Sequence, residues 1–132
     1  MNKNINNKKS IFYISKKNLK KINNVKNATG RKRFNLHKNY KSIIQEMIIN
    51  FNKGSYVKPH FFLKKHTIFR LMEGSFKINI YNKKKTDTIY LKKKNQIIII
   101  KPKTKYDIKS LKKNSIIHEL MEGPFNKKVF KI

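Results

Sequence analysis

The chain has 132 residues, the length of one domain, and it has no cysteine, which excludes disulfides, thiolate metal sites and a thiol nucleophile. Its longest apolar run, Ile97 to Ile100, is too short to cross a membrane as a helix and predicts a short buried strand instead. The 34 Lys and Arg against 6 Asp and Glu give a formal net charge of +28, and 4 glycines leave little room for a dinucleotide-binding fingerprint.

The N-terminal residues predict little regular structure. Residues 1–10 are rich in Asn and Lys without periodicity, so we expect a disordered tail. This polar segment also lacks the apolar centre of a signal peptide, and we therefore expect a cytoplasmic protein. Ser15 is a suitable cap for a short helix to about Asn23. Phe34 and Leu36 alternate with polar residues and predict a short extended segment.

Residues 40–51 carry the spacing of an amphipathic helix. Ile44, Met47, Ile48 and Phe51 fall at positions i, i+3, i+4 and i+7, which share one face of a helix. The sequence therefore predicts a second short helix here.

From Ser55 onward the pattern changes to short segments separated by turns. Phe76, Ile78 and Ile80, for example, alternate with polar residues as in a half-buried strand. Many short strands at regular spacing predict a mainly β sandwich or barrel. The expected strands lie near residues 55–60, 67–73, 76–80, 88–92, 96–101, 104–109, 115–121 and 128–131.

One spacing within these strands resembles the first sequence motif of the cupin superfamily. That motif begins with a glycine, reaches a histidine after five residues, and ends on a second glycine. Gly54, His60 and Gly74 keep this frame. Phe62 stands where the motif has its second histidine, and Thr67 stands where it has a glutamate.

The second cupin motif has a proline-glycine turn followed by a histidine. Pro102 occupies that turn, and Lys103 replaces the glycine. Tyr106 stands at the position of the fourth metal ligand.

Three further matches make the resemblance narrower. The segments are Arg31 to His37, Gly54 to His60 and Glu119 to Phe125, and they occur in the order found in the WbuC family of cupin-fold proteins. The chain thus resembles that family over residues from about 17 to 130.

This resemblance implies a fold and a division of the chain. The fold would be a cupin-type double-stranded β-helix, or jelly-roll barrel, preceded by one or two short N-terminal helices. The chain would divide into a tail at 1–10, a lead-in at 11–53 that packs on the barrel, and the barrel at 54–132.

The resemblance also implies a role and partners. WbuC proteins are associated with bacterial surface-polysaccharide (O-antigen) biosynthesis. The implied ligand is a small molecule such as a sugar or sugar nucleotide. The resemblance allows for a homodimer, since cupins often dimerise. Whether the chain is an enzyme stays open at this point.

A divalent transition metal is the cofactor that the resemblance implies, with iron, nickel, manganese and zinc as the usual choices. His60 is the one histidine left at the four ligand positions, and a single histidine does not hold such an ion tightly. His66 would replace Thr67 only after a one-residue shift, which would turn it to the other face of the strand. The alternative is that these four positions simply fill a packed barrel interior.

Arg31, Arg33 and His37 are candidates for binding an anionic group at the mouth of the barrel, since the planar guanidinium matches carboxylates and phosphates. The alternative for them is ordinary surface charge. The complete set of ligand-pocket candidates is Arg31, Arg33, Asn35, His37, Tyr56, His60, Phe62, Thr67 and Tyr106.

The high positive charge supports an alternative function, a basic nucleic-acid-binding protein, or non-specific binding of polyanions. The best cluster for stacking on single strands joins three aromatic residues to three lysines: Phe61, Phe62 and Tyr56 near Lys58, Lys64 and Lys65. Against this, arginine occurs at three positions only, and nucleic-acid-binding proteins favour arginine. Lysine, asparagine and isoleucine have A/T-rich codons, so compositional bias alone would also produce this charge.

Overall fold

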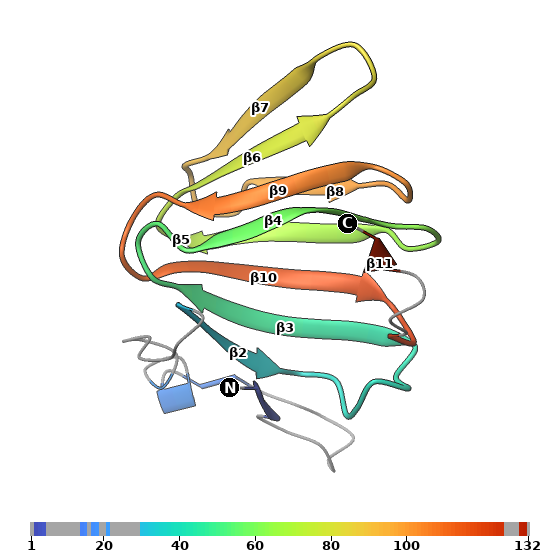
Figure 1. Cartoon of the computed structure of the whole chain (residues 1–132). Helices are drawn as coiled ribbons and strands as arrows, with labels where there is room; N and C mark the ends of the chain where they lie inside the picture. Colours follow the sequence, from blue (N-terminus) through green and yellow to red (C-terminus); the bar gives the residue numbers. More distant parts are fainter. Residues whose placement is uncertain are drawn as a thin grey trace.

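The structure is a computed structural model that describes residues 2–4, 14–15, 17–18, 21, 30–125 and 130–131. Two β-sheets pack face to face (Figure 1). The six-stranded sheet has the order β1 (Asn2–Asn4), β2 (Arg31–Asn35), β3 (Ile44–Phe51), β10 (Ser115–Glu122), β5 (Thr67–Glu73) and β8 (Ile97–Ile100). The five-stranded sheet has the order β11 (Phe130–Lys131), β4 (Tyr56–Phe62), β9 (Lys105–Ser110), β6 (Phe76–Tyr81) and β7 (Thr86–Leu91).

Strands far apart in the sequence lie next to each other in both sheets. β10 pairs antiparallel with β3 on one side and with β5 on the other. β9 lies in the same way between β4 and β6. The prediction of a mainly β protein built from short strands is confirmed.

The predicted helix over residues 40–51 is wrong, because Ile44–Phe51 form β3. This strand is covered on both faces. Met47 and Ile49 point between the sheets, whereas Ile48 packs on the other side of its sheet against Phe34. A strand buried on both faces loses the alternation of apolar and polar residues, so its apolar residues can also match helical spacing.

The predicted helix from Ser15 to about Asn23 lies largely outside the described residues. Of the described residues only Lys17 and Asn18 are helical, and no complete helix is described, so the expected N-terminal helices are not confirmed. None of the described segments is a helix that could span a membrane. Asn2–Asn4, within the segment expected to be a tail, pair in parallel with β2 as β1.

The core lies between the two sheets. Phe51 and Phe76 meet edge to face, with ring centroids 5.0 Å apart. Aromatic pairs of this kind add to the stabilisation from apolar burial. The other buried members of this cluster are Ile49, Phe69, Leu71, Ile78, Leu91, Ile100, Tyr106, Ile108 and Ile117.

The predicted strand at Ile97 to Ile100 is present, but the prediction that it is buried is wrong for one of its two faces. These residues form β8 at the edge of the six-stranded sheet. Ile100 is buried, but Ile97 and Ile99 are 57% and 60% exposed. Successive side chains of a strand point to opposite faces, so an edge strand buries only alternate residues unless a second layer covers it.

Candidate functional site

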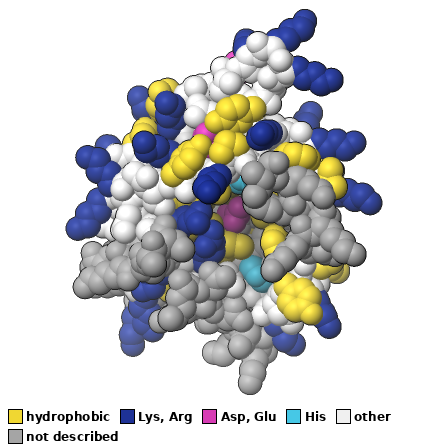
Figure 2. Space-filling model, in the orientation of Figure 1, with side chains coloured by type: hydrophobic (Ala, Val, Ile, Leu, Met, Phe, Trp, Pro, Cys, Tyr) yellow, Lys and Arg dark blue, Asp and Glu magenta, His cyan; other side chains and the backbone are white. Residues whose placement is uncertain are grey.

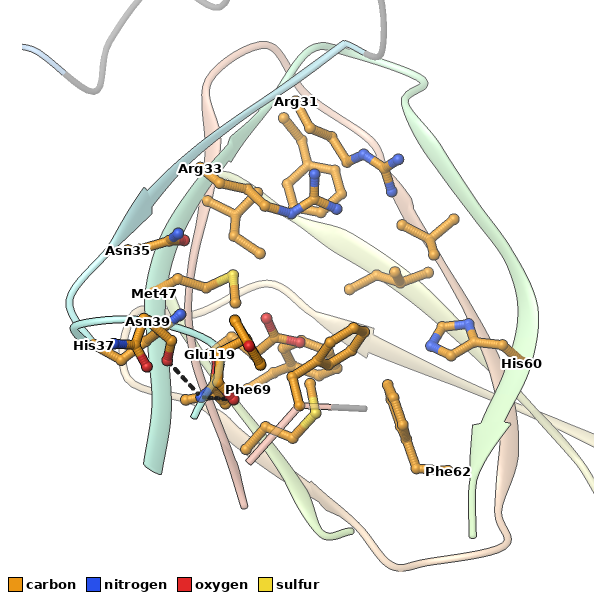
Figure 3. Close-up of a pocket in the computed structure, with 18 of the residues that line it drawn as sticks. Arg31, Arg33, Asn35, His37, Asn39, Met47, His60, Phe62, Phe69 and Glu119 are labelled. Atoms are coloured by element: carbon orange, nitrogen blue, oxygen red, sulfur yellow. Dashed lines mark hydrogen bonds between the residues drawn. The ribbon is translucent and has the colours of Figure 1, made fainter. Parts of the chain in front are cut away.

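A cavity of ≈ 700 Å³ lies between the two sheets. Its walls are mainly apolar, from Met47 and Ile49 on β3, Phe69 on β5 and Ile108 on β9. A few polar side chains interrupt these walls (Figure 3). Enclosed apolar volume with a small number of placed polar groups is the usual character of a small-molecule site. The remaining lining residues are Arg31, Arg33, Asn35, His37, Lys38, Asn39, Tyr40, Gln45, Phe51, Val57, His60, Phe62, Tyr106, Glu119, Met121 and Phe125.

Three polar residues enter the cavity from a single strand. Arg31, Arg33 and Asn35 occupy alternate positions on β2, so their side chains share one face of the strand. Figure 3 shows both guanidinium groups directed into the cavity. Burial, followed by the neighbouring charge of Arg33, lowers the pKa of Arg31. Both effects disfavour the cation, and an anion bound there would offset them.

Glu119 enters the cavity from β10, where it pairs across the sheet with Met47 and Phe69. It is 8% exposed. Burial raises the pKa of its carboxyl group to about 7, while the charges of Arg33 and Arg31 act in the opposite direction. Among the described residues, no ion pair includes Glu119. The site therefore combines two cationic groups with one buried carboxyl group.

The structure brings the four cupin ligand positions together. The ring of His60 lies 4.4 Å from that of Tyr106 and 5.6 Å from that of Phe62, measured between centroids. Thr67 lies close enough to the Tyr106 hydroxyl to affect the pKa of that group. The cupin frame in the sequence thus corresponds to one place in space.

The side chains at these positions do not fit a transition metal. Phe62 offers no donor atom. Burial, and then the charge of Glu119, raise the pKa of Tyr106, so its phenol stays protonated and is a poor ligand. No group of three or more His, Cys, Asp or Glu side chains suited to a metal ion occurs in the described part of the chain. We therefore derive no chemistry through a bound metal.

His60 is held as a neutral imidazole. Its Nδ1 lies 2.8 Å from the carbonyl oxygen of Lys58, and because that oxygen can only accept, Nδ1 carries the hydrogen. Burial lowers the pKa of His60, and the nearby charge of Arg31 acts in the same direction. His60 is therefore uncharged at neutral pH and contributes polarity to the cavity without charge.

One side of the cavity is formed by a loop that follows β2. The buried amide of Gln45 donates hydrogen bonds to the carbonyls of Asn39, Tyr40 and Ser42, at 3.1, 3.3 and 2.9 Å. His37 accepts a hydrogen bond at Nδ1 from the backbone amide of Glu46, at 3.0 Å. These bonds hold the loop, and with it the lining residues His37 and Tyr40, against the start of β3.

A second segment, after β10, closes on this loop. The amide of Gly123 donates to the carbonyl of Ile43 at 2.5 Å, and the amide of Phe125 donates to the carbonyl of Tyr40 at 2.8 Å. A side chain at position 123 would lie 1.9 Å from the carbonyl oxygen of Ser42, so glycine permits this approach. The two segments place Tyr40 and Phe125 together at the cavity.

Two of the predicted pocket residues do not line the cavity. Thr67 is buried at the start of β5 but is not among the lining residues. Tyr56 points to the opposite face of its sheet, where its hydroxyl donates to Asp107 at 2.8 Å. His66 is also outside the cavity, with an exposed side chain that pairs with Glu122. The other seven candidates, Arg31, Arg33, Asn35, His37, His60, Phe62 and Tyr106, do line it.

Glu119 was not among the predicted site residues. The segment from Glu119 to Phe125 stands out in the sequence only through its resemblance to a family. The available signal was a lone acidic residue between Ile117 and Met121, in a chain with six acidic residues. A carboxylate between two apolar residues on the inward face of a strand is uncommon without a partner or a role.

Comparisons with known proteins place the chain in a family and a fold. A model for the family described as a domain of unknown function (DUF6016) matches residues 14–90. No curated protein matches the sequence. The comparisons do not confirm the resemblance to the WbuC family.

Several solved structures share the fold. KdgF from Halomonas sp. superposes with a TM-score of 0.62 and 15% identity, over 75% of this chain and 84% of that one. The cupin domain of Cnp3 from Schizosaccharomyces pombe superposes with a TM-score of 0.61 and 15% identity, over 74% of this chain and 68% of that one. QdtA is a sugar 3,4-ketoisomerase from Thermoanaerobacterium thermosaccharolyticum whose structure was solved with TDP. It superposes with a TM-score of 0.60 and 16% identity, over 64% of this chain and 63% of that one. The two sheets are thus those of a cupin barrel, and the chain belongs to the DUF6016 family.

Proposed function

We propose that this protein binds an anionic small molecule in its barrel cavity, with the guanidinium groups of Arg31 and Arg33 as the anion-binding groups. The observation that carries the proposal is that two of the three arginines in the chain point from β2 into one largely apolar cavity. The planar guanidinium group matches the carboxylate and phosphate groups of small anions, to which it can donate two parallel hydrogen bonds.

The dimensions and walls of the cavity favour a small molecule over a polymer. A volume of ≈ 700 Å³ is within the range of about 300–1,000 Å³ that is usual for small-molecule sites. Tyr40 and Phe125 offer aromatic surface near the opening, at 62% and 38% exposure. Flat or ring-shaped ligands pack well on such surface.

A sugar or sugar nucleotide is the ligand class we propose. Two points support it: the resemblance of three sequence segments to proteins associated with surface-polysaccharide biosynthesis, and the QdtA structure, which was solved with TDP. Sugar phosphates and nucleotides combine an anionic group with rings, which matches the arginines and the apolar walls. The same resemblance supports a bacterial surface-polysaccharide context for the protein.

Isothermal titration calorimetry with TDP, glucose 1-phosphate and glucuronate tests the proposal. We expect at least one of these anions to bind the wild type and to lose ten-fold or more in affinity in Arg31→Gln or Arg33→Gln. Arg70→Gln is the matched control, because Arg70 lies outside the cavity lining and bonds Asn95 at 2.9 Å. Equal affinity in all variants, or no binding of any probe, would overturn the proposal.

The net charge of +28 keeps polyanion binding as a second candidate function. Lys and Arg side chains surround the face shown in Figure 2 without gathering into one stripe. The predicted stacking cluster is also altered, since Phe62 lines the cavity and Lys65 is buried with Nζ 2.7 Å from the carbonyl of Glu122. A salt titration of single-stranded oligonucleotide binding tests this function, which requires an affinity that persists at physiological ionic strength.

A further inference from the structure

We propose that Glu119 is the acid–base group for proton transfer at a carbon next to a carbonyl, in a substrate whose anionic group is bound by Arg31 and Arg33. This inference rests on the proposed function, and it adds an activity to that binding site. The substrate class is a small molecule that carries both an acidic group and a carbonyl group.

The first observation is the position of the carboxyl group. Glu119 lines the cavity and is almost completely buried, and the close-up shows its carboxyl group directed into the same space as the two guanidinium groups (Figure 3). A buried carboxyl group without an ion pair is costly to fold. Such a group that faces a ligand cavity is a candidate for a functional role.

The second observation is the set of groups that face it. Arg31 and Arg33 approach from β2, His60 from β4 and Tyr106 from β9. Glu119 is the one carboxylic acid among the described residues that line the cavity. Burial brings its pKa to about 7, close to the pH at which it would work. An acid–base group is most effective when its pKa lies near the working pH.

The other titratable groups in the cavity are less suited to this role. The pKa of His60 is lowered by burial, and its Nδ1 hydrogen is directed to the carbonyl of Lys58. The pKa of Tyr106 is raised by burial, so its phenol does not give up a proton near neutral pH. These two groups can donate or accept hydrogen bonds, whereas Glu119 can exchange a proton with the substrate.

The proposed step balances without any co-reactant. A carboxylate oxygen of Glu119 takes a proton from the carbon next to the substrate carbonyl. The electrons of the broken C–H bond form a C=C bond, and the C=O π electrons move to the oxygen and give an enolate. The positive charges of Arg31 and Arg33, which act on Glu119 in the same cavity, stabilise this negative charge. Return of the proton from Glu119 to the same carbon regenerates the substrate with its hydrogen exchanged. In a substrate with a hydroxyl group on that carbon, transfer of the hydroxyl proton to the enolate oxygen and delivery of the Glu119 proton to the former carbonyl carbon complete an isomerisation.

The experiment is hydrogen–deuterium exchange at carbon, with pyruvate and dihydroxyacetone phosphate as probes, because each has an anionic group and a carbonyl. Each probe is incubated in D₂O with the protein, and loss of the C–H signals is followed by proton NMR. Glu119→Gln keeps the shape of the side chain and removes its proton transfer. Glu46→Gln is the matched control, because Glu46 pairs with His118 at 2.6 Å outside the cavity lining. Calorimetry on the same samples reports binding separately.

We expect the wild type and Glu46→Gln to accelerate exchange of at least one probe, and Glu119→Gln to lose ten-fold or more of that rate while it still binds the probe. The wild-type rate should rise with pH through about 7, as Glu119 ionises. Binding without exchange in the wild type would overturn this inference and leave the proposed function intact. Exchange that survives in Glu119→Gln would assign the proton transfer to another group. Absence of both binding and exchange would overturn both proposals.

Discussion

His60 and Tyr106 are direct partners across β4 and β9, and their rings lie 4.4 Å apart between centroids. In the cupin motifs these two positions hold metal ligands. Here they form an aromatic contact with two further rings beside it. Between centroids, the ring of Phe62 lies 5.6 Å from that of His60, and the ring of Phe69 lies 6.0 Å from that of Tyr106. In this protein the residues at these positions thus form part of an aromatic wall of the cavity.

This wall leads to a prediction about metals. After exposure to iron, manganese, nickel and zinc, we expect the purified protein and its His60→Ala variant to carry equal background levels of metal, because one neutral histidine offers a single good donor. Elemental mass spectrometry on protein purified in high salt measures this. A near-stoichiometric metal that disappears in His60→Ala would show that other groups complete a site there.

A second prediction concerns the stability of the Glu119→Gln variant. The pKa of Glu119 is raised to about 7 in the folded protein from a usual value of 4.5, mainly by burial. Between these values the folded state holds more protons than the unfolded state, so stability falls as the pH rises from 4.5 through 7. We expect Glu119→Gln to remove this loss of stability. At pH 8 its free energy of unfolding should exceed that of the wild type by on the order of 3 kcal/mol, since each pKa unit is worth about 1.4 kcal/mol.

Urea denaturation of both proteins between pH 4 and pH 8 measures this difference. The two free energies of unfolding should approach each other below pH 4.5, where the carboxyl group is protonated in both states. A constant difference across the whole range would mean that the substitution acts through packing and not through charge.

Lys103 supplies a third prediction. It has φ of 67°, in the left-handed region, at the turn where the cupin motif has glycine. A residue with a side chain loses about 1–2 kcal/mol of stability in this conformation, which glycine avoids. Glycine in turn lowers stability by about 0.4–1 kcal/mol, because it increases the conformational freedom of the unfolded chain. We therefore expect Lys103→Gly to raise the free energy of unfolding by about 0.5–1 kcal/mol.

Lys105→Gly is the matched control for this substitution. Lys105 begins β9, so glycine there should lower stability by about 0.5–1 kcal/mol and remove the same single charge. Thermal denaturation of the two variants measures the contrast. Equal shifts in both would attribute the effect to charge and not to backbone conformation.

Asp107 gives a fourth prediction, on the face of the sheet away from the cavity. Its carboxylate accepts hydrogen bonds from the hydroxyls of Tyr56 and Tyr81 at 2.8 and 2.5 Å and from the side-chain amide of Asn79 at 3.3 Å. Burial acts to raise the pKa of Asp107, but these hydrogen bonds outweigh it and hold the pKa below 3.8. We expect Asp107→Asn to lower stability at pH 7 by about 1.5–3 kcal/mol, the usual worth of hydrogen bonds to a charged group.

The stabilisation by Asp107 should be present above pH 3.8 and should disappear as the pH falls through the lower pKa of the folded state. The difference between the wild type and Asp107→Asn should therefore shrink in strong acid. Asp87→Asn is the control, because Asp87 is 45% exposed and lies 3.4 Å from Lys85, a surface pair expected to be worth less than about 1 kcal/mol. An Asp107 variant as stable as this control at pH 7 would contradict the prediction.

Tyr56 is a predicted pocket residue that lies outside the cavity, and the reason is not visible in the sequence. Tyr56 and His60 are four residues apart, so an unbroken strand would point both side chains to the same face. The pairing of β4 with β9 shifts register between Val57 and His60. This irregularity turns Tyr56 outward to Asp107 while His60 stays inside. A register shift of this kind depends on the partner strand and is not visible in the sequence of one strand.

The sequence by itself determined the run of short strands after Ser55. It also determined four cavity residues on β2 and in the loop after it: Arg31, Arg33, Asn35 and His37. These follow from local alternation and from residue type, which each segment carries on its own. The tertiary structure decided that Ile44–Phe51 form a strand and that Glu119 lies buried beside Arg31 and Arg33. Both depend on β10 lying between β3 and β5, since burial on two faces and a shift in pKa come from residues distant in the sequence.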